Sequence, residues 1–262
     1  MLTRNEIMTQ LEPFGFAVGK PVIVHTSLKA VGEIEGGGQT LLDCLIEFFT
    51  RDNGIFCVPT HTWRWGYLDM RSNETCIGVM PNLAAAHPDG TRTPHPTHSM
   101  AVFGKREFVD EFVRNEENMP TPGHPDGCYG KIYKAGGHVM LLGVNQTKNT
   151  YLHCVEEIIG VPNRLSDAPS ARKVIYKDGR ETTVFTHGHD AHGIAEVSGN
   201  YWKYEPAFRL YGCIFDGTLG DAKVQMCSAR KMKDVMEIIN NRRGDFEIFA
   251  DRNPLDEALY KI

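Results

Sequence analysis

Short apolar runs rich in β-branched residues recur along the chain and predict buried strands. These runs cover residues 22–28, 54–60, 100–104, 138–144 and 221–229. The apolar run 41–49 lies between the first two of these strands and has the length of a helix. It follows the glycine triplet 36–38 and Thr40, which is expected to begin the helix. Because strand, glycine loop, helix and strand follow one another in this order, the pattern predicts a βαβ unit and a parallel sheet.

Helical spacing of apolar positions returns in several later segments. A first helix is expected from Thr3, which forms a capping-box pattern with Glu6. Further helices are expected over residues 106–115, 151–160, 205–212 and 230–242. The helix 151–160 is expected to be capped by Thr150.

In one segment apolar and polar residues alternate, which is typical of a β-hairpin rather than a helix. Residues 173–185 surround Asp178-Gly179, a pair typical of a tight turn between two strands. Residues 61–100 are expected to be loops with one short helix, and a stretch this long without regular structure is often functional. Residues 186–199 are expected to form a loop. The whole pattern predicts one α/β domain over residues 1–262, an α/β/α arrangement with a mainly parallel central sheet and an inserted β-hairpin.

Composition and charge narrow the classes of function. The net charge is −5 over 262 residues, so the chain lacks the basic excess of a nucleic-acid binder. We expect no membrane span, because no apolar stretch approaches about 20 residues, and no signal peptide at the N-terminus. The seven cysteines are odd in number and form no CxxC pair, which argues against a disulfide framework and a structural zinc site. Reduced thiols favour a cytoplasmic location.

The first candidate for chemistry is the pattern Thr150-x-x-His153-x-x-Glu156. His153 and Glu156 are three residues apart in the helix expected at 151–160, so they share one face. A carboxylate one turn from an imidazole fixes its tautomer and raises its basicity, as a general base requires. The helix follows a buried strand, and strand carboxyl ends are where α/β proteins place active sites. The alternative interpretation is an ordinary surface pair.

Two polar clusters are weaker signals by themselves. The segment His25–Leu28 precedes the glycine triplet and leads toward a helix N-terminus, where backbone N–H groups bind anions. The segment His95–Ser99 places two imidazoles and two hydroxyls within five residues. The alternatives are a tight turn that needs glycine and a polar loop directed by Pro96.

A third cluster, His187-Gly-His189-Asp190-Ala-His192, suggests a metal site because histidine is a common zinc ligand. Its aspartate stands one place too early for the His-x-His-x-Asp-His pattern of metallo-β-lactamase-type hydrolases. A solvated histidine-rich loop is the competing interpretation. Cys154, flanked by Leu152 and Val155, is expected to be a small core residue rather than a nucleophile.

Taken together and in order, these blocks resemble the aminoglycoside 3-N-acetyltransferase family. The resemblance runs from about residue 20 to about residue 240. It is carried by the segments HTSLKAVGEIEGGGQTLLDCL, GIFCVPTHTW, TPHPTHSMAVFG, GCYGKIYKAGGHVMLLGV, TYLHCVEEI and GDAKVQMCSARKMKDV.

The resemblance implies an α/β/α fold, acetyl-CoA as the donor and direct transfer to an amine, the 3-amino group of an aminoglycoside. It implies His153 as general base and Glu156 as the carboxylate that orients it. Contacts to CoA are expected from His25, Thr26, Ser27, Leu28, Lys29, His95 and Ser99. Contacts to the acceptor are expected from Thr60, His61 and Glu205, with the cationic Lys203 in the same acceptor segment. No metal is expected.

Other functions stay open on the sequence alone. The acceptor is alternatively a non-aminoglycoside amine. The HGHDAH loop is compatible with a metal-dependent hydrolase. The residues expected near the acceptor are also compatible with a protein that binds CoA without catalysing a reaction. The expected partners are CoA and a small amine, without nucleic acid or membrane, and a homodimer also stays open.

Overall fold

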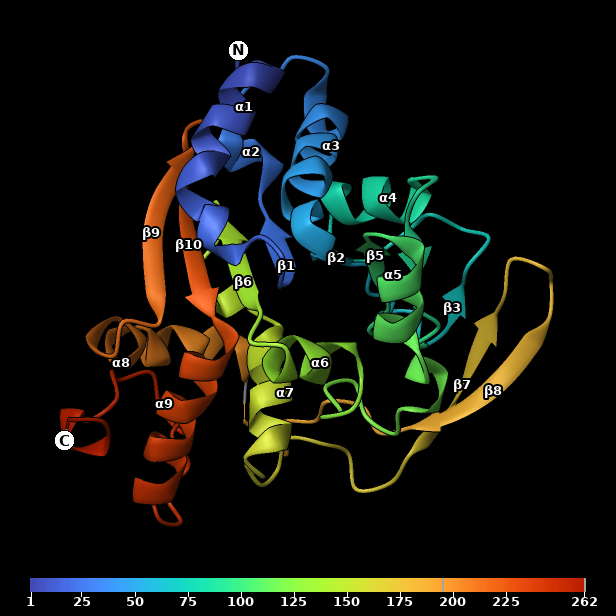
Figure 1. Ribbon diagram of the computed structural model, residues 1–262. Helices are drawn as coiled ribbons and strands as arrows, with labels where there is room; N and C mark the ends of the chain where they lie inside the picture. Colours follow the sequence, from blue (N-terminus) through green and yellow to red (C-terminus); the bar gives the residue numbers. More distant parts are fainter. Residues whose placement is uncertain (195, 262) are drawn as a thin grey trace.

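The computed structural model describes residues 1–194 and 196–261. Residue 195, inside the loop expected at 186–199, and residue 262, the end of the expected domain, lie outside this description. The chain builds one seven-stranded sheet in the order β4-β5-β2-β1-β6-β10-β9 (Figure 1). The strands are β1 Pro21–Thr26, β2 Ile55–Pro59, β4 Thr91–Arg92, β5 Met100–Phe103, β6 His138–Leu142, β9 Ile214–Leu219 and β10 Ala222–Ser228.

The centre of this sheet is parallel. Strand β1 pairs in parallel with β2 on one side and with β6 on the other. Strands β5, β4, β10 and β9 extend the sheet outward through antiparallel pairs. The predicted α/β fold around parallel central strands is confirmed. The strands at both edges of the same sheet pair antiparallel.

Helices cover both faces of the sheet, because successive residues of the buried strands point to opposite sides. Val22 and Val24 of β1 pack into the core beneath α1 Arg4–Leu11, α3 Gly37–Phe49 and α4 Val79–Ala86. Ile23 points into the opposite core. That core contains residues of α5 Arg106–Val113, α6 Cys128–Lys134, α7 Tyr151–Ile158, α8 Glu205–Leu210 and α9 Ala229–Arg242. The α/β/α layering predicted from the sequence is therefore present.

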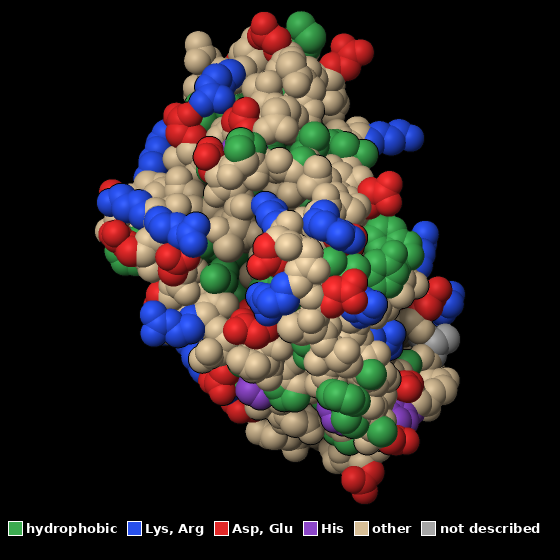
Figure 2. Space-filling view, turned by 90° about the vertical axis from the view of Figure 1, so that its right-hand side faces the viewer, with side chains coloured by type: hydrophobic (Ala, Val, Ile, Leu, Met, Phe, Trp, Pro, Cys, Tyr) green, Lys and Arg blue, Asp and Glu red, His purple; other side chains and the backbone are tan. Residues whose placement is uncertain are grey.

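The inserted hairpin forms its own small sheet. Strands β7 Ser170–Ile175 and β8 Glu181–Thr186 pair antiparallel, and β3 Leu68–Asp69 adds to β7 in parallel. Gly179 has a φ of +84° in the turn, which explains why the hairpin signal includes a glycine. The hairpin projects from the side of the molecule (Figure 1), and the surface seen from that side mixes basic and acidic side chains (Figure 2).

Some element boundaries and one expected cap differ from the sequence prediction. The first strand ends at Thr26, because Ser27 becomes the N-cap of the short helix α2 Leu28–Val31. Helix α3 begins at Gly37 rather than after Thr40, and Gly36 precedes it with a φ of +74°. The side chain of Thr150 makes no capping hydrogen bond, although it does occupy the N-cap position of α7.

Besides the short elements α2, β3 and β4, one further helix and one further strand were not predicted. Helix α6 contains Gly130 at its centre, and strand β9 contains Asp216 and Gly217, so neither shows a clean apolar period. Tertiary packing forms both. Among residues 1–194 and 196–261, no helix is long and apolar enough to span a bilayer.

Candidate active site

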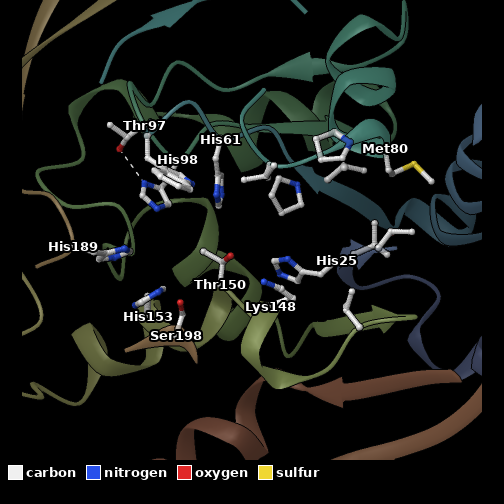
Figure 3. A pocket seen from close by; sticks show the side chains of 18 of the residues that line it. His25, His61, Met80, Thr97, His98, Lys148, Thr150, His153, His189 and Ser198 are labelled. Atoms are coloured by element: carbon white, nitrogen blue, oxygen red, sulfur yellow. Dashed lines mark hydrogen bonds between the residues drawn. The ribbon is translucent and has the colours of Figure 1, made fainter. Parts of the chain in front are cut away.

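A cavity of about 730 Å³ opens where β1 and β2 end and where α7 begins after β6. Figure 3 shows His98, His153 and His189 gathered at one end of this cavity, with His25 and Met80 toward the other. The site therefore lies at the carboxyl ends of the parallel strands, as α/β folds generally place it.

His153 lies in the first turn of α7 and lines the cavity. Its Nδ1 atom is 2.7 Å from the Tyr201 hydroxyl, which donates a 2.5 Å hydrogen bond to Oε2 of Glu156. The direct separation between His153 Nδ1 and Glu156 Oε2 is 3.6 Å. The predicted shared helix face of His153 and Glu156 is correct, but a tyrosine hydroxyl bridges the pair.

This bridge determines the tautomer of the imidazole. A tyrosine hydroxyl has one hydrogen, and the hydroxyl of Tyr201 gives it to Glu156. Its oxygen then accepts a hydrogen from His153, so Nδ1 carries the proton. The other ring nitrogen, Nε2, keeps a free lone pair, which is the state that a general base needs.

Glu156 is held by buried partners on its other side. Its side chain is fully buried, and its Oε1 accepts a 2.8 Å hydrogen bond from Nε of Arg164. Arg164 in turn donates a 2.8 Å hydrogen bond to Glu247. A buried carboxylate with a paired guanidinium avoids the cost of an isolated charge. The chain His153, Tyr201, Glu156, Arg164 and Glu247 is therefore one connected network.

The surroundings lower the pKa values of both His153 and Glu156, for different reasons. Burial and, to a smaller extent, the neighbouring His189 lower the pKa of His153 to about 4, although Glu156 opposes them. Burial alone would raise the pKa of Glu156, but His153, Arg164 and Tyr201 outweigh burial and hold that pKa below its ordinary value. At neutral pH the site therefore contains a neutral imidazole and an ionised carboxylate.

The HGHDAH segment contributes one histidine to this site. The His189 ring stacks on the His153 ring with centroids 4.1 Å apart, and its Nε2 is 3.4 Å from Oε1 of Glu157. Nδ1 of His187 lies 2.6 Å from the Ser166 carbonyl oxygen. Within residues 1–194 and 196–261, no three His, Cys, Asp or Glu side chains converge on a common metal position.

The residues expected to bind CoA separate into two groups. His25, Thr26 and Ser27 line the cavity, whereas the neighbouring Leu28 packs against the core and Lys29 is exposed. His95 and Ser99 are fully buried and are not among the described residues of the cavity wall.

His95 and Ser99 instead support the wall from behind. Nδ1 of His95 accepts hydrogen bonds from the backbone of Thr97 and His98, and Ser99 bonds the Thr60 carbonyl oxygen. His98 thus lines the cavity, whereas His95 lies behind its wall.

Of the residues expected to bind the acceptor, one lines the cavity and two do not. His61 lines the cavity, and its Nε2 is 2.8 Å from the Tyr129 hydroxyl. Thr60 is fully buried, and its hydroxyl is 2.9 Å from that of Ser99. Neither Thr60 nor Glu205 belongs to the described cavity wall, and the Glu205 carboxylate accepts hydrogen bonds from Arg209 and Gln225 instead.

Lys203 does not face the acceptor space either. Its side chain is 2% exposed and its ammonium group donates hydrogen bonds to the Ile248 carbonyl oxygen and to Asp251. The ammonium group of Lys203, which was expected beside the acceptor, is therefore paired with Asp251 instead. Its burial follows from the packing of segment 198–204 against segment 246–251, which no local pattern indicates.

Several important side chains had no signal in the sequence. Tyr201 and Arg164 lie 45 and 8 residues from Glu156, outside the reach of helical spacing. The cavity also exposes Lys148 and Arg172, which sequence patterns did not single out. The position of Lys148 two residues before Thr150 was the one available hint, since loops at strand ends commonly bind ligands.

Comparison with known proteins defines the class of this fold and site. The family model described as aminoglycoside 3-N-acetyltransferase matches residues 23–239. The chain therefore belongs to the aminoglycoside 3-N-acetyltransferase family.

Individual relatives agree with this assignment. Aminoglycoside N(3)-acetyltransferase VIII of Streptomyces fradiae is 26% identical over 197 residues, which is 67% of this chain and 65% of that protein. The match thus spans slightly less than two thirds of the relative's length.

Solved structures share the fold. The YokD protein of Bacillus subtilis has a TM-score of 0.74 at 20% identity, over 90% of this chain and 98% of that one. A binary complex of AAC-IIIb with CoASH has a TM-score of 0.70 at 19% identity, over 88% and 93% of the two chains.

Proposed function

We propose that this protein transfers an acetyl group from acetyl-CoA directly to an amine, with His153 as the general base. The observation that carries the proposal is the hydrogen-bonded series from His153 through Tyr201 to Glu156 at the wall of a large cavity. A protein that only bound CoA would have no need of a buried carboxylate to orient an imidazole.

In the proposed reaction the neutral amine attacks the thioester carbonyl carbon, so that a C–N bond forms and the C–S bond breaks. Nε2 of His153 takes the proton from the attacking nitrogen. Glu156, acting through the Tyr201 hydroxyl, stabilises the imidazolium that forms. The thiolate of CoA leaves, and the cavity supplies rate by holding both substrates in line.

The donor is proposed to enter along His25, Thr26 and Ser27, which line the side of the cavity where β1 ends. Membership of the family and the CoASH-bound structural relative support acetyl-CoA as co-substrate. All seven cysteines are free, which fits the reducing cytoplasm that we propose as the site of action.

The names of the relatives make aminoglycosides the first acceptors to test. His61, His153 and His189 are proposed to surround the reacting amine, since all three line the cavity.

The proposed function is tested by release of CoA thiol from acetyl-CoA in the presence of amines. We expect His153→Ala to lower kcat/KM by at least about 100-fold, because the attacking amine loses its proton acceptor. His124→Ala is the matched control, since His124 lies outside the described cavity wall. Equal turnover by His153→Ala and the parent protein would contradict the role of His153.

A further inference from the structure

The charged side chains on the cavity wall are all basic. Among the described residues that line the cavity, the Lys and Arg side chains are Lys148 and Arg172, and no Asp or Glu is present. Neither cation has an ion-pair partner among residues 1–194 and 196–261. The outer surface near the hairpin, in contrast, carries both signs of charge (Figure 2).

The histidines that face the cavity around the base add no charge to its wall. Burial lowers the pKa of His61, of His98 and of His153, so these imidazoles are neutral at neutral pH. An aminoglycoside brings several ammonium groups, and each loses hydration when it enters a cavity. The described wall itself carries no carboxylate that would offset that loss, and the nearest ones, Glu156 and Glu157, lie behind His153 and His189.

Arg172 has a defined position on the cavity wall. It belongs to β7 of the hairpin, and its guanidinium lies so close to Gly66 that a Cβ there would be 2.2 Å from Nη1. Gly66 belongs to the turn that follows His61, whose ring lies 4.5 Å from that of His98. The guanidinium therefore packs against the turn that directly follows His61, another residue of the cavity wall.

An exposed aromatic side chain belongs to the turn that Arg172 contacts. Trp63 lines the cavity, is 49% exposed and belongs to the same turn as Gly66. Lys148, in contrast, lies beside His25 in Figure 3, on the side proposed for CoA. Lys148 is thus on the side proposed for the donor, whereas Arg172 contacts the turn after His61, one of the residues proposed to surround the amine.

We propose that the acceptor is an amine that also carries an anionic group, a carboxylate or a phosphate, and that the Arg172 guanidinium binds this group. A planar guanidinium matches both anions through two parallel N–H donors. Trp63 offers a flat apolar surface to the remainder of the molecule. This inference rests on the proposed acetyl transfer and assigns its substrate class.

The test compares matched amines in the thiol-release assay. The first pair is 2-phenylethylamine and phenylalanine, which differ by a carboxylate. The second is ethanolamine and O-phosphoethanolamine, which differ by a phosphate. Sisomicin serves as the polycationic acceptor. We expect the anionic member of at least one pair to have a kcat/KM about tenfold or more above its partner and above sisomicin.

Variants of the hairpin connect this preference to one residue. Arg172→Gln is expected to remove the preference and to leave the KM for acetyl-CoA unchanged, while Arg172→Glu reverses it toward 2-phenylethylamine. Arg180→Gln is the control on the same hairpin, because the guanidinium of Arg180 lies 3.7 Å above the Tyr176 ring at the turn. Circular dichroism of each variant checks that the fold is kept.

The outcomes separate the inference from the function on which it rests. Thiol release that is fastest with sisomicin, or that occurs with none of the four simple amines although acetyl-CoA binds, overturns the anionic acceptor. A higher KM for acetyl-CoA in Arg172→Gln overturns it as well, since Arg172 then binds the donor. Failure of the parent protein to bind acetyl-CoA in calorimetry removes the proposed function itself.

Discussion

At the scale of single residues, His153 depends on a hydroxyl group 48 positions further along the chain. Tyr201 accepts the Nδ1 hydrogen of the imidazole and passes its own hydrogen to Glu156. The ring is thereby held in one tautomer and one orientation. The arrangement links the basicity of His153 to a carboxylate that it does not contact within hydrogen-bonding distance.

Replacing Tyr201 by Phe tests this link. The variant keeps the ring but removes the acceptor for Nδ1–H, so we expect kcat/KM to fall by about 10- to 100-fold. Tyr204→Phe is the matched control, because the Tyr204 ring stacks on Phe208 in the neighbouring core. Nitrogen NMR of His153 reports the tautomer directly, and an unchanged tautomer in Tyr201→Phe would contradict the bridge.

Replacing Glu156 by Gln tests the charge rather than the bridge. Glu156 raises the pKa of His153 against the effect of burial, so its loss is expected to lower that pKa further below about 4. The rate should fall, and the acid limb of the kcat/KM profile should move to lower pH. A pH profile identical to that of the parent protein would remove Glu156 from the mechanism.

At the scale of elements, α6 shows how a helix without a clear sequence signal supports the site. Its Tyr129 hydroxyl is 2.8 Å from His61, and its Gly130 packs against the backbone of Pro125. A Cβ on Gly130 would lie 2.0 Å from the Pro125 carbonyl oxygen. The close approach of this helix to the preceding loop therefore requires glycine at this position.

Gly130→Ala is expected to lower the free energy of unfolding by about 1–2 kcal/mol, because overpacking outweighs the better helix propensity of alanine. Urea unfolding measures this change. Gly15→Ala is the control, since nothing lies within 4 Å of the added methyl group. Equal stability of the two variants would show that the loop before α6 moves aside without lowering the free energy of unfolding.

At the scale of the whole molecule, the fold buries several neutral histidines. Burial lowers the pKa of His25, His138 and His153 to about 4 and that of His95 to about 3. In the unfolded chain these groups return to their ordinary pKa of about 6.5. The unfolded state therefore binds more protons than the folded state between these values.

The sign of the pH dependence follows from this difference. The stability contributed by the neutral histidines is fully present above about pH 6.5 and is lost as the pH falls toward 4. Each group contributes a slope of up to about 1.4 kcal/mol per pH unit. Urea unfolding between pH 7 and 4.5 should show a steep loss of stability, and His138→Gln should reduce the slope by one proton. An unchanged slope in that variant would contradict the buried neutral state of His138.

Much of the fold was predictable because strands and helices have short periods. The strands around 22–26, 55–59 and 138–142 and the hairpin around Gly179 were all visible as local patterns. Helix α6 and strand β9 were not, because glycine and aspartate interrupt their periods and tertiary contacts compensate. The pairing of His153 with Glu156 on one helix face was predictable for the same reason of short spacing.

The sequence by itself determined the α/β class, the family and the helix that presents His153, because each depends on residues close together in the chain. Only the tertiary structure decided that Tyr201 bridges His153 to Glu156, and that Ser99 and Lys203 are withdrawn from the cavity. It also decided that Arg172 faces the cavity without a carboxylate partner in the described part of the chain. The physical reason is that these contacts join segments separated by tens of residues, and packing rather than local spacing selects them.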